Sequence, residues 1–225
     1  MHQLKFSIDG QVREVAIKDL VVAGWTGRDA DAVEHHIAEL EAIGVARPRT
    51  VPCFYRVSNT LLTTEENLDM TGPDSSGEAE FVIVSLEDGL YVGIGSDHTD
   101  RKVEAYGVTV SKQMCAKPVS ATLWRLADVE AHWDSLLLRS WVTRNGERSL
   151  YQEGLVTKML APLDLIGRYT NGGSTLPVGT AMYCGTLTVI GPIGGGERFE
   201  VELEDPVNKR ILKHAYNVRT LPYVD

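Results

Sequence analysis

Alternating hydrophobic and polar residues predict strands at the start of the chain. Residues 5–8 and 12–17 alternate in this way. They flank Asp9-Gly10, a pair that adopts positive φ at little cost and is typical of a β-hairpin turn. The apolar run 20–23 then predicts a buried strand that ends at Gly24. The chain is therefore expected to begin with sheet.

Helical spacing replaces this alternation in a few places. Over 29–43, apolar residues recur at positions i, i+4 and i+7, and Gly44 then provides a stop signal. We expect further helices at 102–113, 128–133 and 159–169.

The rest of the chain is predicted to be mostly sheet. Three prolines and little periodicity over 46–77 predict a long ordered loop with one strand near 53–55. Asn145-Gly146 is the strongest hairpin signal. The expected strands are 78–84, 90–94, 136–144, 147–152, 180–189, 199–204 and 209–218. Together these elements predict one α+β domain over 1–225, predominantly β, with 1–20 as an N-terminal hairpin extension.

Composition narrows the classes of function. The 225 residues carry 22 Lys and Arg against 31 Asp and Glu, and this net charge of −9 argues against a nucleic-acid binder. No apolar run reaches the roughly 18–20 residues that span a bilayer, and the first residues do not resemble a secretory signal. The three cysteines are odd in number and far apart, as expected for reduced thiols. We therefore expect a cytoplasmic protein that binds neither membrane nor nucleic acid.

Glu78 and Glu80 are the first candidates for chemistry. Residues i and i+2 of a strand project to one face, so the two carboxylates repel each other unless water or a cation separates them. Asp97 follows the partner strand, and three hard oxygen ligands suit Mg²⁺ or Mn²⁺. The alternative is a solvated strand end beside a polar turn, and the spacing alone leaves it open.

His36 and Lys112 are the candidates for proton transfer and charge stabilisation. His36 lies at the edge of the buried stripe of the first helix, where Glu39 could orient it as a general base. The alternative is a half-buried salt bridge between the same two residues. Lys112 ends a helix, where an ammonium either neutralises a developing oxyanion or merely complements the helix terminus.

These segments, in this order, resemble the fumarylacetoacetate hydrolase superfamily from about residue 20 to the end of the chain. Residues 36–39 are similar to its H-x-x-E lid helix, and 78–80 to its E-x-E segment. Residues 95–101 resemble G-N-D-x-[ST]-A-R, which supplies the third metal ligand, and 112–114 resemble the K-S-F segment with the active-site lysine. Later, 145–152 resembles N-G-E-x-x-Q.

The resemblance implies a mixed-sheet β-roll or sandwich, a homodimer and a bound Mg²⁺ or Mn²⁺. It also implies hydrolysis of a C–C bond in a 2-oxo acid, such as an acylpyruvate-type β-diketo acid, through a metal-stabilised enolate. The expected metal ligands are Glu78, Glu80 and Asp97. The expected catalytic residues are His36, Glu39 and Lys112. The expected substrate contacts are Tyr55, Gly185 and Thr186, of which Thr186 matches the T-G-T-P motif. Arg101 is expected to brace the Asp97 turn.

Several positions depart from the family pattern. Gly179-Thr180 replaces Gly-Asp, Leu187 stands in place of proline, and Gln113-Met114 replaces Ser-Phe. These changes indicate a short, divergent subgroup and leave the reaction open. The alternatives are a 2-oxo-acid decarboxylase, isomerase or hydratase, or a non-catalytic protein that binds a metal or small ligand.

Overall fold

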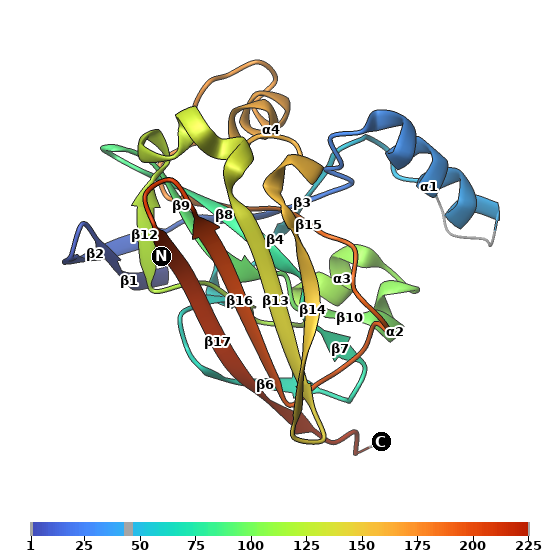
Figure 1. The fold of residues 1–225 in the computed structure, drawn as a ribbon. Helices are drawn as coiled ribbons and strands as arrows, with labels where there is room; N and C mark the ends of the chain where they lie inside the picture. Colours follow the sequence, from blue (N-terminus) through green and yellow to red (C-terminus); the bar gives the residue numbers. More distant parts are fainter. Residues whose placement is uncertain (1, 43–46, 225) are drawn as a thin grey trace.

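Two sheets dominate the fold (Figure 1). The computed structural model describes residues 2–42 and 47–224, apart from the side chains of His36, Glu39 and Leu40. Within these residues, the larger sheet has eight strands in the order β2 (Gln11–Ile17), β1 (His2–Ile8), β12 (Thr122–Arg125), β9 (Gly89–Ser96), β8 (Ala79–Leu86), β15 (Thr180–Thr186), β3 (Asp19–Gly24) and β4 (Cys53–Val57). The five-stranded sheet has the order β14 (Glu147–Leu155), β13 (Leu137–Arg144), β16 (Arg198–Asp205), β17 (Arg210–Leu221) and β6 (Asn67–Thr71). Two small pairs complete the sheet structure: β10 (Thr99–Asp100) with β7 (Ser75–Ser76), and β11 (Lys117–Pro118) with β5 (Leu62–Thr63).

Both predicted hairpins are confirmed. Asp9 and Gly10 have φ of 51° and 75° between β1 and β2, and Asn145 and Gly146 have φ of 52° and 77° between β13 and β14. Residues that tolerate positive φ therefore close both tight turns. The α+β, predominantly β fold class is confirmed as well, and the sheets are mixed because β15 runs parallel to β3 and β17 parallel to β6.

The centre of the eight-stranded sheet is buried on both faces, which explains the continuous apolar runs in β3 and β8. On β8, Phe81 and Ile83 pack into the core that the two large sheets share, and Val82 and Val84 pack into a second core on the other face. Figure 1 shows the five-stranded sheet lying across the larger one. Each such side chain contributes about 1.5–3 kcal/mol on burial, so the ends of β8 and β9 are held by a rigid frame.

The helices are shorter than predicted. Helix α1 (Ala30–Ala42) agrees with the expectation except for residues 43 and 44, which lie outside the described residues. The helix expected at 102–113 is divided into α2 (Arg101–Glu104) and α3 (Val108–Gln113), because the backbone at Gly107 is extended, with φ of −177°. Helix α4 (Pro162–Tyr169) starts three residues later than expected, since proline favours the first helical position. The predicted helix at 128–133 is replaced by the 3₁₀ turns η2 (Leu126–Asp128) and η3 (Glu130–Ser135), and η1 (Asn59–Leu61) and η4 (Val156–Lys158) are also 3₁₀.

The prediction of a single strand within 46–77 was wrong. Besides β4, this stretch contains β5, β6 and β7. In β6, the buried Leu68 and Met70 alternate with three exposed polar residues, and the strand pairs in parallel with β17. The alternation covers only five residues, so it was hidden among the surrounding turn residues.

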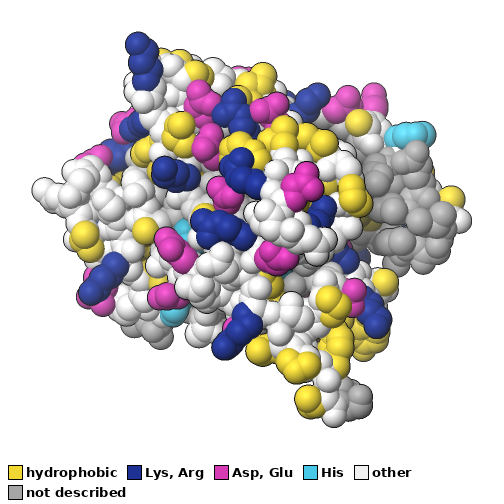
Figure 2. Space-filling view, turned by 60° about the horizontal axis from the view of Figure 1, so that its bottom comes forward, with side chains coloured by type: hydrophobic (Ala, Val, Ile, Leu, Met, Phe, Trp, Pro, Cys, Tyr) yellow, Lys and Arg dark blue, Asp and Glu magenta, His cyan; other side chains and the backbone are white. Residues whose placement is uncertain are grey.

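Charged residues are mixed on the surface. On the face seen in Figure 2, Lys and Arg side chains are interspersed with Asp and Glu, without a large area of one sign. In the part of the chain that the structure describes, no helix is long and apolar enough to cross a membrane. The excess of acids therefore does not form an acidic patch on that face.

Candidate metal centre

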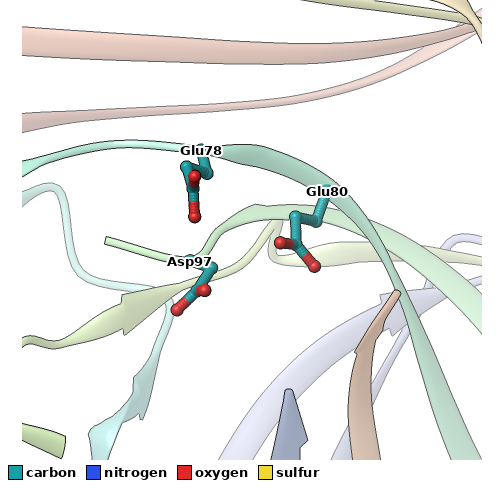
Figure 3. A group of neighbouring side chains, drawn as sticks. All are labelled: Glu78, Glu80 and Asp97. Carbon is teal, nitrogen blue, oxygen red and sulfur yellow. The ribbon is translucent and has the colours of Figure 1, made fainter. Parts of the chain in front are cut away.

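Pairing between β8 and β9 brings three carboxylates together (Figure 3). Glu78 precedes β8, Glu80 lies in it, and Asp97 follows β9. In the antiparallel register Glu80 faces Gly95, and the Asp97 amide donates to the Glu78 carbonyl at 2.9 Å. One oxygen from each carboxylate lies within 4.8 Å of the others. The predicted clustering of Glu78, Glu80 and Asp97 is therefore present.

Burial makes this cluster electrostatically costly. Glu80 and Asp97 are 2% and 0% exposed, and the Glu78 side chain is 19% exposed. Burial, and then the charges of Asp97 and Glu78, raise the pKa of Glu80 well above its ordinary value, and burial raises that of Glu78. Burial opposes ionisation of Asp97 too, but the ammonium groups of Lys112 and Lys117 outweigh it and lower the pKa of Asp97. The cluster therefore favours additional positive charge.

The environment of Asp97 fits a hard divalent cation. Its Oδ2 accepts a hydrogen bond from Lys112 Nζ. Its buried Oδ1 lies 3.4 Å from Lys117 Nζ but receives no hydrogen bond from any described residue. A buried carboxylate oxygen normally has a hydrogen-bond partner or an ion. Mg²⁺ and Mn²⁺ prefer oxygen ligands. The three carboxylates supply such ligands, and the unpartnered Oδ1 of Asp97 is one of them.

Lys112 lies at the end of α3 and reaches into the cluster. Its Nζ is 3.9 Å from Glu78 Oε2 and 5.9 Å from the centre of the Tyr55 ring. Burial opposes the charge of Lys112, yet Asp97, Glu78 and Glu80 outweigh that effect and raise its pKa. Burial, followed by Cys53, raises the pKa of the Tyr55 hydroxyl to about 12. The site therefore holds a charged lysine next to a neutral tyrosine.

The two predicted substrate contacts on β15 make structural hydrogen bonds. The Gly185 amide donates to Glu80 Oε2 at 2.6 Å. A side chain at Gly185 would place Cβ 1.7 Å from Thr26 Oγ1, so glycine is required there. Thr186 donates its proton to the Ala79 carbonyl at 2.8 Å. A bond from Thr186 to a substrate carboxylate remains a prediction, and it requires that proton to be redirected.

Arg101 braces Glu78, whereas the sequence placed that brace at the Asp97 turn. Its Nη1 donates to Glu78 Oε1 at 3.2 Å and to Glu104 Oε2 at 3.1 Å, and its Nε donates to Ser76 Oγ at 2.6 Å. The arginine thus fixes one carboxylate of the cluster, and its guanidinium is occupied by protein groups.

The predicted general base and its partner lie on α1, which stands away from the sheets in Figure 1. The side chains of His36 and Glu39 are outside the described residues. Their catalytic roles therefore remain predictions.

Two further buried residues support the site. Lys117 is fully buried and donates to the carbonyls of His98, Lys112 and Cys115 at 2.6, 2.6 and 3.0 Å. These three acceptors match the three N–H groups of an ammonium, although burial lowers the pKa of Lys117. Gln152 accepts from the Ala79 amide at 2.9 Å and donates to Thr186 Oγ1 at 2.7 Å. Only the N-G-E-x-x-Q match pointed to Gln152, and no local pattern indicates that Lys117 is buried.

Comparison with known proteins shows the family and the fold of the chain. The family described as "Protein of unknown function (DUF2848)" matches residues 23–216. No curated protein sequence matches the chain. A candidate fumarylpyruvate hydrolase from Burkholderia cenocepacia is similar over 99% of this chain and 97% of its own, with a TM-score of 0.66 and 16% identity.

Two further solved structures extend the comparison. Fumarylpyruvate hydrolase from Pseudomonas aeruginosa, in complex with Mn²⁺ and pyruvate, is similar over 97% of both chains, with a TM-score of 0.63 and 14% identity. The 2-hydroxyhepta-2,4-diene-1,7-dioate isomerase from Mycobacterium marinum is similar over 93% of this chain and 78% of its own, with a TM-score of 0.61 and 19% identity. These likenesses confirm the fumarylacetoacetate hydrolase fold that the sequence motifs predicted.

Proposed function

The chain belongs to the DUF2848 family, and we propose that it is an enzyme that uses Mg²⁺ or Mn²⁺ to hydrolyse a C–C bond of an acylpyruvate-type 2-oxo acid. The observation that carries the proposal is the buried convergence of Glu78, Glu80 and Asp97 with Lys112. The shared fold of the Pseudomonas aeruginosa hydrolase, whose structure contains Mn²⁺ and pyruvate, supports it.

In this proposal, Glu78, Glu80 and Asp97 hold the cation. Once bound, the cation supplies a Lewis acid and a template for the oxygens of the 2-oxo acid. Other groups of the chain hold these ligands in place. Arg101 donates a hydrogen bond to Glu78, and the Gly185 amide donates one to Glu80. The adjacent lysines keep Asp97 ionised. The three carboxylates are therefore held in place independently of the substrate.

The remaining steps belong to side chains of this protein. Lys112 is charged and oriented by Asp97, so it stabilises negative charge that develops on a substrate oxygen. A pre-placed donor of this kind contributes on the order of 3 kcal/mol to the transition state. His36, oriented by Glu39, activates water or moves the proton that cleavage requires. Tyr55 borders the place where the substrate binds.

Turnover of a small acylpyruvate series by the purified protein tests the proposal. We expect cleavage with Mg²⁺ or Mn²⁺, loss of cleavage with a chelator, and recovery when the cation is restored. Glu80→Gln keeps the size of the side chain but should lose both cation binding and turnover. The matched control is Glu202→Gln, in the half-buried Arg139 cluster away from the site, which should change neither. Full activity of Glu80→Gln in chelator-treated buffer would overturn the proposal.

The products and the exchange of solvent deuterium at C3 distinguish hydrolysis from the other reactions that the fold supports. Exchange without cleavage would show that the protein enolises 2-oxo acids but that the compound tested is not its substrate. No exchange with any compound, in protein that binds the cation, would favour the binding protein over the enzyme.

A further inference from the structure

A tyrosine from the five-stranded sheet contacts both residues that flank Asp97. Tyr216 lies on β17 and is completely buried. Its hydroxyl donates to Ser96 Oγ at 2.8 Å and lies 2.9 Å from His98 Nδ1. One hydroxyl group therefore holds the residue before Asp97 and the residue after it.

The hydrogen-bond directions around His98 are consistent with a neutral ring. Because Tyr216 gives its only proton to Ser96, Nδ1 of His98 must donate to the Tyr216 oxygen. Nε2 then accepts from Ser75 Oγ at 2.9 Å. Burial, followed by the charges of Lys117 and Arg101, lowers the pKa of His98 to about 3. The ring is thus a fixed connector that carries no charge.

The same chain of hydrogen bonds reaches Glu78. Ser96 Oγ accepts from the Glu78 amide at 3.1 Å. The residue before Glu78 is Gly77, where a Cβ would lie 2.6 Å from the Tyr216 hydroxyl oxygen and 2.8 Å from Ser96 Oγ. A side chain at Gly77 would therefore displace the hydroxyl groups that connect the two sheets. The backbones of two of the three carboxylate residues are fixed from the five-stranded sheet.

We propose that Tyr216 and His98 are positioning residues of the cation site: they set the separation of the Glu78 and Asp97 carboxylates and thereby the affinity for the cation. Neither residue contacts the cation or the substrate. The inference rests on the proposed function because it concerns the same carboxylates. Loss of a group that orients metal ligands typically weakens affinity by about 10–100-fold.

The chain offers a matched pair of variants. Tyr216→Phe removes the connecting hydroxyl. Tyr151→Phe removes a hydroxyl from the same buried cluster, where Tyr151 also packs on Phe199 but its oxygen has no hydrogen-bond partner among the described residues. Calorimetric titration with Mn²⁺ alone should show affinity about tenfold weaker in Tyr216→Phe and unchanged in Tyr151→Phe. A lowered Tm with unchanged Mn²⁺ affinity in Tyr216→Phe would overturn the inference and leave the tyrosine a structural role only.

A second readout does not depend on the cation. In chelator-treated protein, the Glu78 amide should exchange its hydrogen faster in Tyr216→Phe than in the wild type or Tyr151→Phe, because its acceptor Ser96 is no longer held. Unchanged exchange would also overturn the inference. Wild-type protein that binds no Mn²⁺ would instead contradict the proposed function, while the exchange result still decides the role of Tyr216. If Tyr216→Phe does not fold, Ser75→Ala is the alternative, because it removes only the hydrogen bond to His98 Nε2. Mn²⁺ affinity should then fall and exchange of the Glu78 amide should rise, each by less than in Tyr216→Phe.

Discussion

The cation site and the outer face of the five-stranded sheet are built from the same kinds of side chains. On the outer face, Arg139 donates to Glu153 at 2.8 Å and to Glu204 at 2.6 Å. In the site, Lys112 contacts Asp97 and Glu78. Both regions thus contain a cation surrounded by carboxylates. Ion pairing alone therefore does not identify a functional site.

Solvent exposure separates the two regions. The Arg139 side chain is 24% exposed and its three carboxylate partners are 21%, 32% and 46% exposed, whereas Lys112 and Asp97 are 7% and 0% exposed. Water screens the outer cluster, so its pairs contribute little to stability. In the site, desolvation is the largest influence on each titratable group and makes any unbalanced charge costly. The same residue types therefore contribute little to stability in the outer cluster, whereas in the site each charge must be balanced by an opposite charge.

The largest effect that tests this comparison is expected from Asp97→Asn. The substitution leaves the ammonium groups of Lys112 and Lys117 buried without the carboxylate that faces both. Loss of one partner from a buried ion pair costs about 3–5 kcal/mol. The free energy of unfolding, measured with urea in chelator-treated buffer, should fall by this amount. Glu204→Gln is the matched control on the outer face and should cost less than about 1 kcal/mol. Equal losses would show that burial does not separate the two regions.

An intermediate effect is expected in the pH dependence of stability. Because the pKa of Glu80 is raised well above 4.5 in the folded chain, the folded state keeps a proton that the unfolded state releases. The stabilisation that this bound proton provides is complete below pH 4.5. It is lost as the pH rises towards the pKa of Glu80 in the folded state. In chelator-treated protein this loss should reach at most about 1.4 kcal/mol per pH unit. Glu80→Gln should lack this component of the slope, and Glu202→Gln should keep it. A wild-type slope identical to that of Glu80→Gln would contradict the burial argument.

The smallest effect is expected from Arg139→Met. The change removes the cation from the outer cluster but leaves its carboxylates hydrated. We expect the free energy of unfolding to change by less than about 1 kcal/mol, and the difference from wild type to shrink as salt is added. Thermal unfolding at low and high ionic strength measures both. A loss comparable with that of Asp97→Asn would mean that the outer cluster is effectively buried.

The parts of the site that depend on neighbouring strands could be predicted from the sequence. Glu78 and Glu80 are two residues apart at the start of β8, and Asp97 directly follows the paired strand β9, so local geometry alone brings the three together. The two hairpins were predictable for the same reason, because each turn is encoded by two adjacent residues. Short-range rules are sufficient wherever the interacting residues are joined by a single hairpin.

The supporting residues could not be predicted in this way. Tyr216 contacts Ser96 across 120 positions, and Gln152 contacts Ala79 across 73. The hydrophobic pattern of the sequence does not indicate such contacts, because they depend on how one sheet packs against the other. Lys117 resembles an exposed charged residue in the sequence, and only the burial of the surrounding segment turns it into an internal cation. The break at Gly107 differs from these cases, because glycine is a poor helix former and the residue itself pointed to the interruption.

The central position of β15 in the larger sheet has a consequence for the order of folding. The amide that holds Glu80 comes from Gly185, 105 positions later in the chain, and β15 must insert between β8 and β3 before that bond forms. Contacts over such separations form slowly, because the chain loses much entropy in closing them. We therefore expect the cation site to be completed late in folding, after the local hairpins. Mn²⁺ should stabilise the finished protein by mass action yet leave its refolding rate almost unchanged.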